Sequence, residues 1–146
     1  MSQENVEIVR RTFQVIRDAV LRGDPGAAFD QAVLEGLLDP NVEWRAGRAG
    51  ALPPPISDSG GRDGYMELAR TWTETFDDLV FDAEEIIEAH NDRVVVITRV
   101  HGIGKESRAL VEVRYGAVYT VKGGRIVRWE IFPTPAQALE AVGLRE

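Results

Sequence analysis

The last third of the chain consists of three β-rich runs joined by short, glycine-bearing turns. The runs span residues 93–101, 108–122 and 125–132, and a helix signal over residues 134–137 follows at once. The preceding part of the chain is mainly helical in pattern, so helices and strands are segregated rather than alternating. This order predicts an α+β fold in which a terminal helix closes a curled antiparallel sheet. Because a sheet that curls around helices encloses a pocket, we expect the functional site there.

Length and composition predict one domain over residues 1–146. Of the 146 residues, 44% are hydrophobic, which is enough for one packed core, and no shift in composition marks a second domain. The 24 acidic residues outnumber the 17 basic ones, so nucleic acid and acidic membranes, which are themselves negatively charged, are poor partners. No apolar run approaches the length of a membrane span, and the N-terminus lacks a signal-peptide pattern. We therefore expect a cytoplasmic protein.

Three helices are predicted before the β-rich runs. In residues 3–22 apolar side chains recur at steps of three and four, which is the spacing of one helical face. Asp24 and Pro25 have the N-cap and first-turn chemistry that opens a second helix. A third helix is predicted over residues 63–76, and a short strand containing Trp44 precedes it.

Sequence patterns also predict a long loop, a β-bulge and a tight turn between these elements. Residues 46–61 are rich in glycine and proline and have no apolar period, which predicts a long loop that is either a lid over the pocket or a plain solvated connection. A strand is predicted over residues 79–90, and its alternation slips between Phe81 and Ile86, as a β-bulge causes. Gly123-Gly124 predicts a tight hairpin turn.

Seven segments of the chain, in this order and spacing, resemble the SnoaL-like branch of the NTF2-like superfamily. They are residues 3–11, 38–44, 61–62, 92–96, 102–107, 124–128 and 138–144, which read QENVEIVRR, LDPNVEW, GR, DRVVV, GIGKES, GRIVR and ALEAVGL. The resemblance covers nearly the whole chain. It implies a cone, in which a strongly curved antiparallel sheet of about four to six strands wraps around the N-terminal helices, with an interior pocket and a short C-terminal helix. It also implies a homodimer that pairs through the sheet.

The resemblance carries no complete catalytic set over to this chain. Steroid isomerases of the superfamily bear a catalytic aspartate at the position that matches Trp44. The polyketide cyclases bear an aspartate near the end of the last strand, where this chain has Pro133 or a neighbour. Limonene-type epoxide hydrolases use an Asp-Arg-Asp set, of which only Arg99 has a counterpart here. Since fold alone does not fix function, the residues must be weighed one by one.

Arg99, His101 and Glu112 form the candidate catalytic set. Arg99 and His101 are two apart on one strand, so their side chains share a face, and Glu112 is available on the next strand. A carboxylate-oriented His101 would serve as general acid or base, and Arg99 would bind an oxyanion or a carboxylate. In strand order the nearest carboxylate partners of Arg99 are Glu112 and Glu130. The alternative is that this face is solvated or faces a second copy of the chain.

Aromatic side chains form the candidate ligand-binding pocket. They are Trp44, Tyr65, Trp72, Tyr119 and Trp129, with Tyr115 beside them in the sequence. Aromatic walls with a few polar groups are typical of small-molecule pockets, although the same residues at strand or helix spacing also build plain cores. Among them Trp44 is favoured as a ligand contact, because its position is functional in the relatives.

No metal site or cofactor is expected. The chain has two histidines and no cysteine, and no His-x-x-x-His or Glu-x-x-His pair occurs. No glycine-rich run follows a strand and opens a helix, so a dinucleotide or phosphate loop is absent too.

Three functions stay open. The first is a small-molecule-binding domain with a hydrophobic cavity. The second is an isomerase, cyclase or hydratase/hydrolase acting on a hydrophobic ring compound, with His101 or Glu112 as the base and Arg99 or Tyr119 as the electrophilic partner. The third is a dimeric, non-catalytic adaptor. A homodimer through the outer sheet face is expected, because apolar residues such as Val94, Val96 and Val100 lie opposite the face that carries Arg99 and His101.

Overall fold

The computed structural model describes residues 2–22, 24–46 and 59–144 and confirms the α+β class. The helices are α1 (Ser2–Arg22), α2 (Pro25–Leu34), α3 (Gly61–Thr75) and α4 (Pro135–Ala141). The strands are β1 (Leu38–Ala46), β2 (Ser59–Gly60), β3 (Phe76–Ala89), β4 (Arg93–Gly104), β5 (Leu110–Lys122) and β6 (Arg125–Phe132). Most of the predicted loop over residues 46–61, namely residues 47–58, lies outside the described residues, and with it the choice between a lid and a solvated connection. Among the helices of the described part, none is long and apolar enough to cross a membrane.

The strands form one open sheet in the order β2-β1-β6-β5-β4-β3. Every neighbouring pair is antiparallel except β1 and β6, which run parallel. That pair departs from the antiparallel expectation. It is possible because β2 to β5 lie between the two strands in the sequence, which gives the chain ample length for a crossover. Pairing of the first long strand with the last brings Trp44 directly opposite Trp129.

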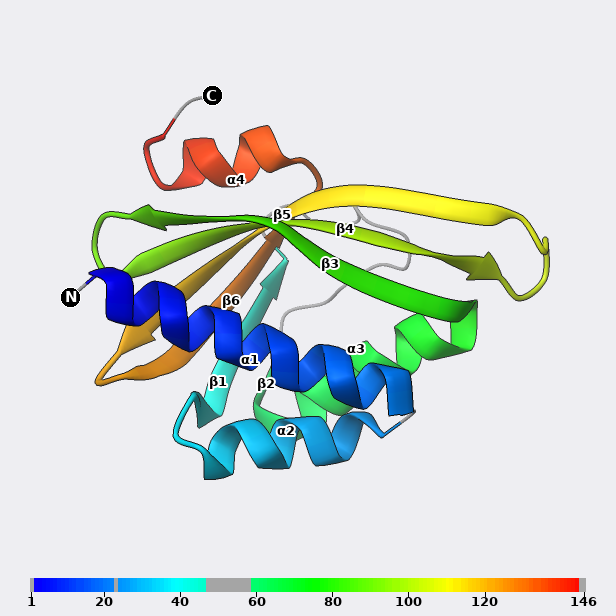
Figure 1. Cartoon of the computed structure of the whole chain (residues 1–146), viewed down its shortest axis with the longest axis horizontal. Helices are drawn as coiled ribbons and strands as arrows, with labels where there is room; N and C mark the ends of the chain where they lie inside the picture. The colour runs from blue at the N-terminus through cyan, green and yellow to red at the C-terminus, as the bar shows by residue number, and fades with distance from the viewer. Residues whose placement is uncertain (1, 23, 47–58, 145–146) are drawn as a thin grey trace.

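The two faces of the sheet are covered by different helices (Figure 1). We call the face that packs against α1, α2 and α3 the inner face, and the face on which α4 lies the outer face. The larger apolar core fills the inner side and joins side chains such as Val9, Phe29 and Tyr119. A smaller core lies between α4 and the outer face, around Ile97 and Leu139. Each side chain of β4, β5 and β6 is therefore assigned to one face by strand alternation.

Local signals in the sequence are confirmed at the turns and caps. The register of β3 against β4 shifts between Ala83 and Glu85, which is the bulge predicted between Phe81 and Ile86. Gly123 and Gly124 both have positive φ, 61° and 78°, as the tight hairpin requires.

The helix caps have the chemistry that the sequence predicts. The Asp24 carboxylate accepts a hydrogen bond from the Ala27 N–H at 3.2 Å, with Pro25 in the first turn of α2. The Thr134 hydroxyl oxygen accepts one from the Gln137 N–H at 3.2 Å and caps α4. Each cap satisfies a donor that the helix itself leaves unpaired.

Helix α4 lies directly on the backbone of β5. A Cβ atom at Gly116 would overlap the Cβ of Ala138 and would lie 3.3 Å from the Pro135 Cα. Glycine at this one strand position therefore allows the close approach of α4 to the sheet.

Candidate functional site: an aromatic cluster on the inner face

Five aromatic side chains on the inner side make a continuous set of ring contacts, which we call the aromatic cluster. They are Phe29, Tyr65, Trp44, Trp129 and Tyr119. The shortest distances between ring centroids are 4.4 Å for Tyr119 with Trp129 and 4.8 Å for Trp44 with Trp129. Strand register explains both contacts, because Trp129 of β6 lies opposite Trp44 of β1 on one side and opposite Tyr119 of β5 on the other.

Trp72 lies apart from the other predicted pocket residues. Its ring contacts Phe76 at 5.8 Å and Phe81 at 5.6 Å between centroids, where α3 meets β3. The structure therefore brings Trp44, Tyr65, Tyr119 and Trp129 together and does not bring Trp72 to them.

The two indole N–H groups of the aromatic cluster differ in their hydrogen bonding. Trp44 Nε1 donates to the Gly61 carbonyl oxygen at 3.0 Å, which ties β1 to the start of α3. Trp129 Nε1 is fully buried and has no hydrogen-bond partner among the residues that the structure describes. An indole N–H can only donate, and a buried donor without an acceptor is costly, so this atom is a place where an acceptor would be stabilised.

The inner side is apolar and carries no buried charge. Among the described residues, Thr12 and Thr98 are the buried polar side chains besides the aromatic ones. The Thr12 hydroxyl donates to the Ile8 carbonyl within α1. Thr98 lies on the inner face of β4, opposite Tyr115 of β5. Thr98 was not among the predicted site residues, although its alternation with Val96 and Val100 identifies its face.

Burial further disfavours ionisation of the tyrosines on this side. It raises the pKa of Tyr65, Tyr115 and Tyr119 above the ordinary tyrosine value, and for Tyr119 the neighbouring Tyr115 adds to the rise. The cause is the loss of hydration that a tyrosinate would suffer in these surroundings. At neutral pH each hydroxyl is therefore a neutral group that can donate a hydrogen bond.

The candidate catalytic residues lie on the outer face, away from the aromatic cluster. On β4, Val96 and Val100 pack into the inner core, so the alternating Arg99 and His101 point to the other side. His101 lies directly opposite Glu112 of β5 in the strand register, as the sequence suggested. Within the described part of the chain, however, no hydrogen bond or ion pair joins their side chains.

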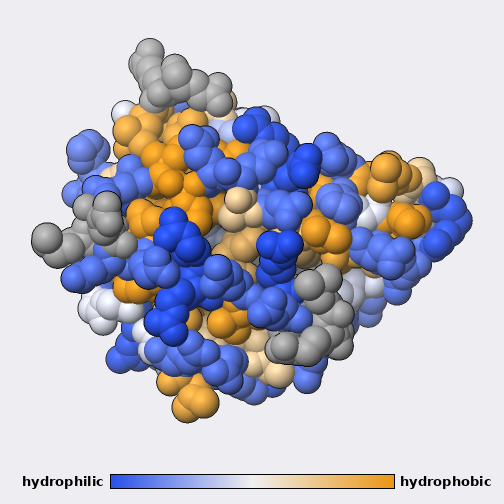
Figure 2. Space-filling view, in the orientation of Figure 1, coloured by the Kyte–Doolittle hydropathy of each residue, from blue (hydrophilic) through white to orange (hydrophobic). Residues whose placement is uncertain are grey.

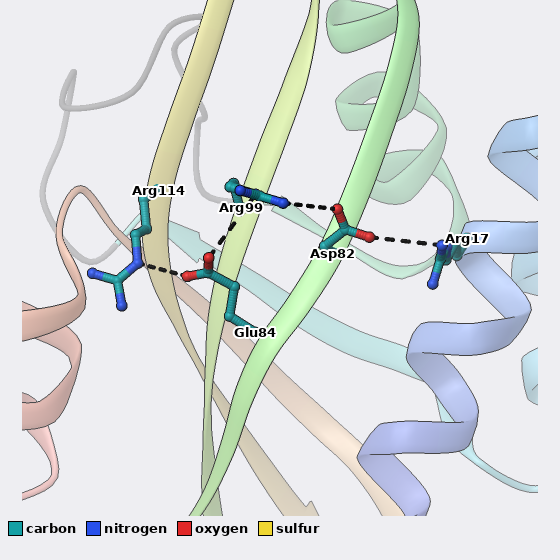
Figure 3. Close-up of polar contacts among 5 residues, drawn as sticks. All are labelled: Arg17, Asp82, Glu84, Arg99 and Arg114. Carbon is teal, nitrogen blue, oxygen red and sulfur yellow. Dashed lines mark hydrogen bonds and ion pairs between the residues drawn. The ribbon is translucent and has the colours of Figure 1, made fainter.

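Arg99 belongs to a charge network of five residues that extends from the outer face of the sheet, past the edge strand β3, to Arg17 of α1 (Figure 3). The network comprises Arg17, Asp82, Arg99, Glu84 and Arg114. Arg99 lies 3.8 Å from Asp82 and 3.9 Å from Glu84, measured between charged atoms, and its side chain is 42% exposed. The expectation that Glu112 or Glu130 is its partner is wrong. Asp82 of β3 lies directly opposite Arg99, whereas Glu112 and Glu130 belong to β5 and β6.

Comparison with known proteins identifies the fold family. The model of the SnoaL-like domain matches residues 12–129. An NTF2-like protein from Burkholderia thailandensis has a TM-score of 0.68 and 23% identity, with 92% of this chain and 95% of that chain covered. A protein from Jannaschia sp., provisionally named a SnoaL-like polyketide cyclase, has a TM-score of 0.65 and 17% identity over 90% and 86% of the two chains.

A third solved structure is of a protein that was co-crystallised with a small molecule. TerC, co-crystallised with polyporic acid, has a TM-score of 0.63 and 21% identity, and the match covers 88% of this chain and 89% of that chain. At these identities the solved structures show the fold alone. No curated protein matches the chain. Because the domain model spans most of the sequence, and the sheet and helices have the fold of the NTF2-like structures, this chain belongs to the SnoaL-like family.

Proposed function

We propose that this protein binds a small hydrophobic ring compound at the aromatic cluster on the inner face of the sheet. The observation that carries the proposal is the buried Trp129 indole N–H, which has no partner among the described residues although aromatic rings surround it. A ring compound with a hydrogen-bond acceptor would bury apolar area against these rings and satisfy that donor. The fold shared with TerC, which was co-crystallised with polyporic acid, is consistent with such a ligand.

The candidate catalytic residues lie on the face of the sheet opposite the aromatic cluster. This separation favours a binding function over catalysis by those residues. Arg99, His101 and Glu112 belong to the outer face, whereas the aromatic cluster belongs to the inner face. A side chain on one face of a sheet does not reach a ligand on the other. A base on the outer face would therefore be unable to abstract a proton from a compound held by the aromatic cluster.

An isomerase, cyclase or hydratase at the aromatic cluster is the alternative, and the observation that favours it is Tyr119. A neutral hydroxyl in apolar surroundings can donate to the carbonyl of a ring compound and stabilise a developing negative charge. Tyrosine is protonated at neutral pH, and burial raises the pKa of Tyr119 further, so its hydroxyl is a hydrogen-bond donor and not a base. An enzyme of this kind would lose turnover in Tyr119→Phe while its affinity for the compound changed much less.

Indole N–H signals test the proposed site directly. The chain has three tryptophans, and a proton–nitrogen correlation spectrum reports each of them separately once Trp→Phe variants assign the signals. We expect methyl naphthyl ketone, used as the probe, to shift the Trp129 and Trp44 signals and to leave the Trp72 signal in place. Binding that shifts only Trp72, or that shifts none of the three, would refute a site at the aromatic cluster.

A further inference from the structure

We infer that the ligand of this site is an uncharged ring compound that presents a carbonyl or similar acceptor to Trp129, and that the site rejects carboxylates of the same shape. This inference rests on the proposed function and narrows it to a chemical class. It has two parts, an acceptor requirement and a charge requirement, and each depends on different residues.

The acceptor requirement comes from the hydrogen bonding of the two cluster indoles. The donor of Trp44 is occupied by the Gly61 carbonyl at 3.0 Å. The donor of Trp129 has no acceptor within the described ranges, and the residue as a whole is 8% exposed. Since an indole nitrogen cannot accept a hydrogen bond, only a ligand acceptor, and no ligand donor, can satisfy it. A hydrocarbon of the same shape would leave this donor unpaired.

The charge requirement comes from the composition of the inner side. In the described part of the chain, the buried polar or charged residues are Thr12 and Thr98, and neither carries a charge. The guanidinium groups of Arg99 and Arg114 are on the outer face, where they form ion pairs with Asp82 and Glu84. An ionised carboxylate moved to the aromatic cluster would therefore lose its hydration without gaining a cation.

Burial of Tyr115 and Tyr119 has the same electrostatic consequence for these side chains as for a ligand. Burial raises the pKa of Tyr115 and Tyr119, so the protein itself holds potential anions there in the neutral form. The physical cause, loss of hydration without a compensating positive charge, applies equally to an anionic ligand. Neutral hydroxyls, by contrast, can donate to a second acceptor on the same compound.

Three probes with one ring system separate the two requirements. They are methyl naphthyl ketone, ethylnaphthalene and naphthoate, substituted at the same ring position and measured by calorimetry at neutral pH. We expect the ketone to bind about two- to tenfold more tightly than ethylnaphthalene, which corresponds to one added hydrogen bond. We expect naphthoate to bind more weakly than the ketone by roughly tenfold or more, because its charge is not compensated.

A variant pair assigns the acceptor preference to one atom. Trp129→Phe keeps an aromatic ring but removes the donor, so the ketone should lose its advantage over ethylnaphthalene. Trp72→Phe is the matched control, because Trp72 packs against Phe76 and Phe81 away from the aromatic cluster, and it should retain the preference. Should Trp129→Phe fold poorly, the wild-type spectrum gives the same information. The Trp129 indole proton should then move downfield with the ketone and not with ethylnaphthalene.

The outcomes distinguish failure of this inference from failure of the proposed function. Equal affinity for all three probes would overturn the inference while leaving a ring-binding site in place. Tightest binding of naphthoate would overturn it as well and would indicate a cation at the site. No binding of any probe would refute the proposed function itself, and the inference would fall with it.

Discussion

Two tryptophans that lie opposite each other in the sheet differ in the hydrogen bonding of their indole N–H groups. Trp44 and Trp129 are opposite each other in the pairing of β1 with β6, and their rings are 4.8 Å apart. The Trp44 donor is bonded to Gly61, so it holds β1 against α3, whereas the Trp129 donor is unpaired. The sequence favoured Trp44 as a ligand contact from its family position. Its ring remains a candidate contact, but Trp129 supplies the polar atom.

This difference could not be predicted from the sequence for a physical reason. Alternation along a strand assigns a residue to a face, but a hydrogen bond depends on which backbone atom a distant segment brings near. The acceptor for Trp44 is 17 residues away, at the first residue of α3. The same limitation explains Arg99, whose carboxylate neighbours come from β3 and not from the strands that follow it.

At the residue scale, Arg99→Ala is expected to lower the free energy of unfolding by about 1 kcal/mol or less. The side chain is 42% exposed and its two ion pairs are long, 3.8 and 3.9 Å, so solvent screens much of the interaction. Chemical denaturation measures the change. Arg10→Ala, which breaks an exposed pair with Glu7 on α1, is the matched control and should give a similar value. A loss of roughly 3–5 kcal/mol would instead mean that Arg99 is half of a buried pair.

At the element scale, the sequence predicts the existence of nearly every strand and helix but not all of their neighbours. The Thr134 cap, the glycine turn and the β3 bulge are local features, so the residues around them suffice. The parallel pairing of β1 with β6 joins segments at opposite ends of the chain, and no local pattern encodes it. Four of the five predicted pocket aromatics meet because of that pairing and of the α3 position, while Trp72 lies at the other end of α3.

The position of α4 depends on the absence of a side chain at Gly116. We expect Gly116→Ala to lower the free energy of unfolding by about 1–3 kcal/mol, because the new methyl overlaps Ala138 and a packed interface resists added volume. Ala138→Gly in the same chain should recover part of that loss. A double-mutant cycle by denaturation measures the coupling. Additive effects of the two substitutions would show that α4 does not rest on this strand position.

At the scale of the whole molecule, the aromatic cluster and the strand residues Arg99 and Arg114 of the charge network lie on opposite faces of one sheet. Figure 2 shows hydrophilic residues over much of the surface in this orientation, with hydrophobic residues in smaller patches among them. The sorting follows from strand alternation, which is why the sequence placed Val94, Val96 and Val100 opposite Arg99 and His101 correctly. Alternation alone does not predict which of the two faces packs against the helices α1 to α3. That depends on tertiary packing, and so does the location of the candidate site.

Alkaline titration tests the apolar character of the inner side. All three tyrosines of the chain have a raised pKa because of burial. The folded protein therefore holds these protons more tightly than the unfolded chain, so stability is unaffected below the ordinary tyrosine pKa of 10.0 and falls as the pH rises above it. We expect tyrosinate absorbance to appear together with the loss of near-ultraviolet circular dichroism. Tyrosinate that forms while the fold persists would mean that water reaches these hydroxyls.

A homodimer through the outer face remains a prediction. The outer face combines the charge network with the exposed Leu110, 76% accessible, at the start of β5. Light scattering at micromolar concentration and moderate salt should give twice the mass of the chain. Arg114→Glu should reduce the dimer fraction if this face is the interface, whereas Arg10→Glu on α1 should not. A monomer mass for the unaltered protein would contradict the prediction.

The most direct measurement is a crystal structure of the protein with methyl naphthyl ketone. The account predicts that the naphthyl ring packs against Trp129 and Tyr119 on the inner face. The ketone oxygen should lie about 2.7–3.2 Å from Trp129 Nε1, the usual length of such a hydrogen bond. A ligand bound instead on the outer face beside Arg99 and His101, with the Trp129 donor still unpaired, would contradict it.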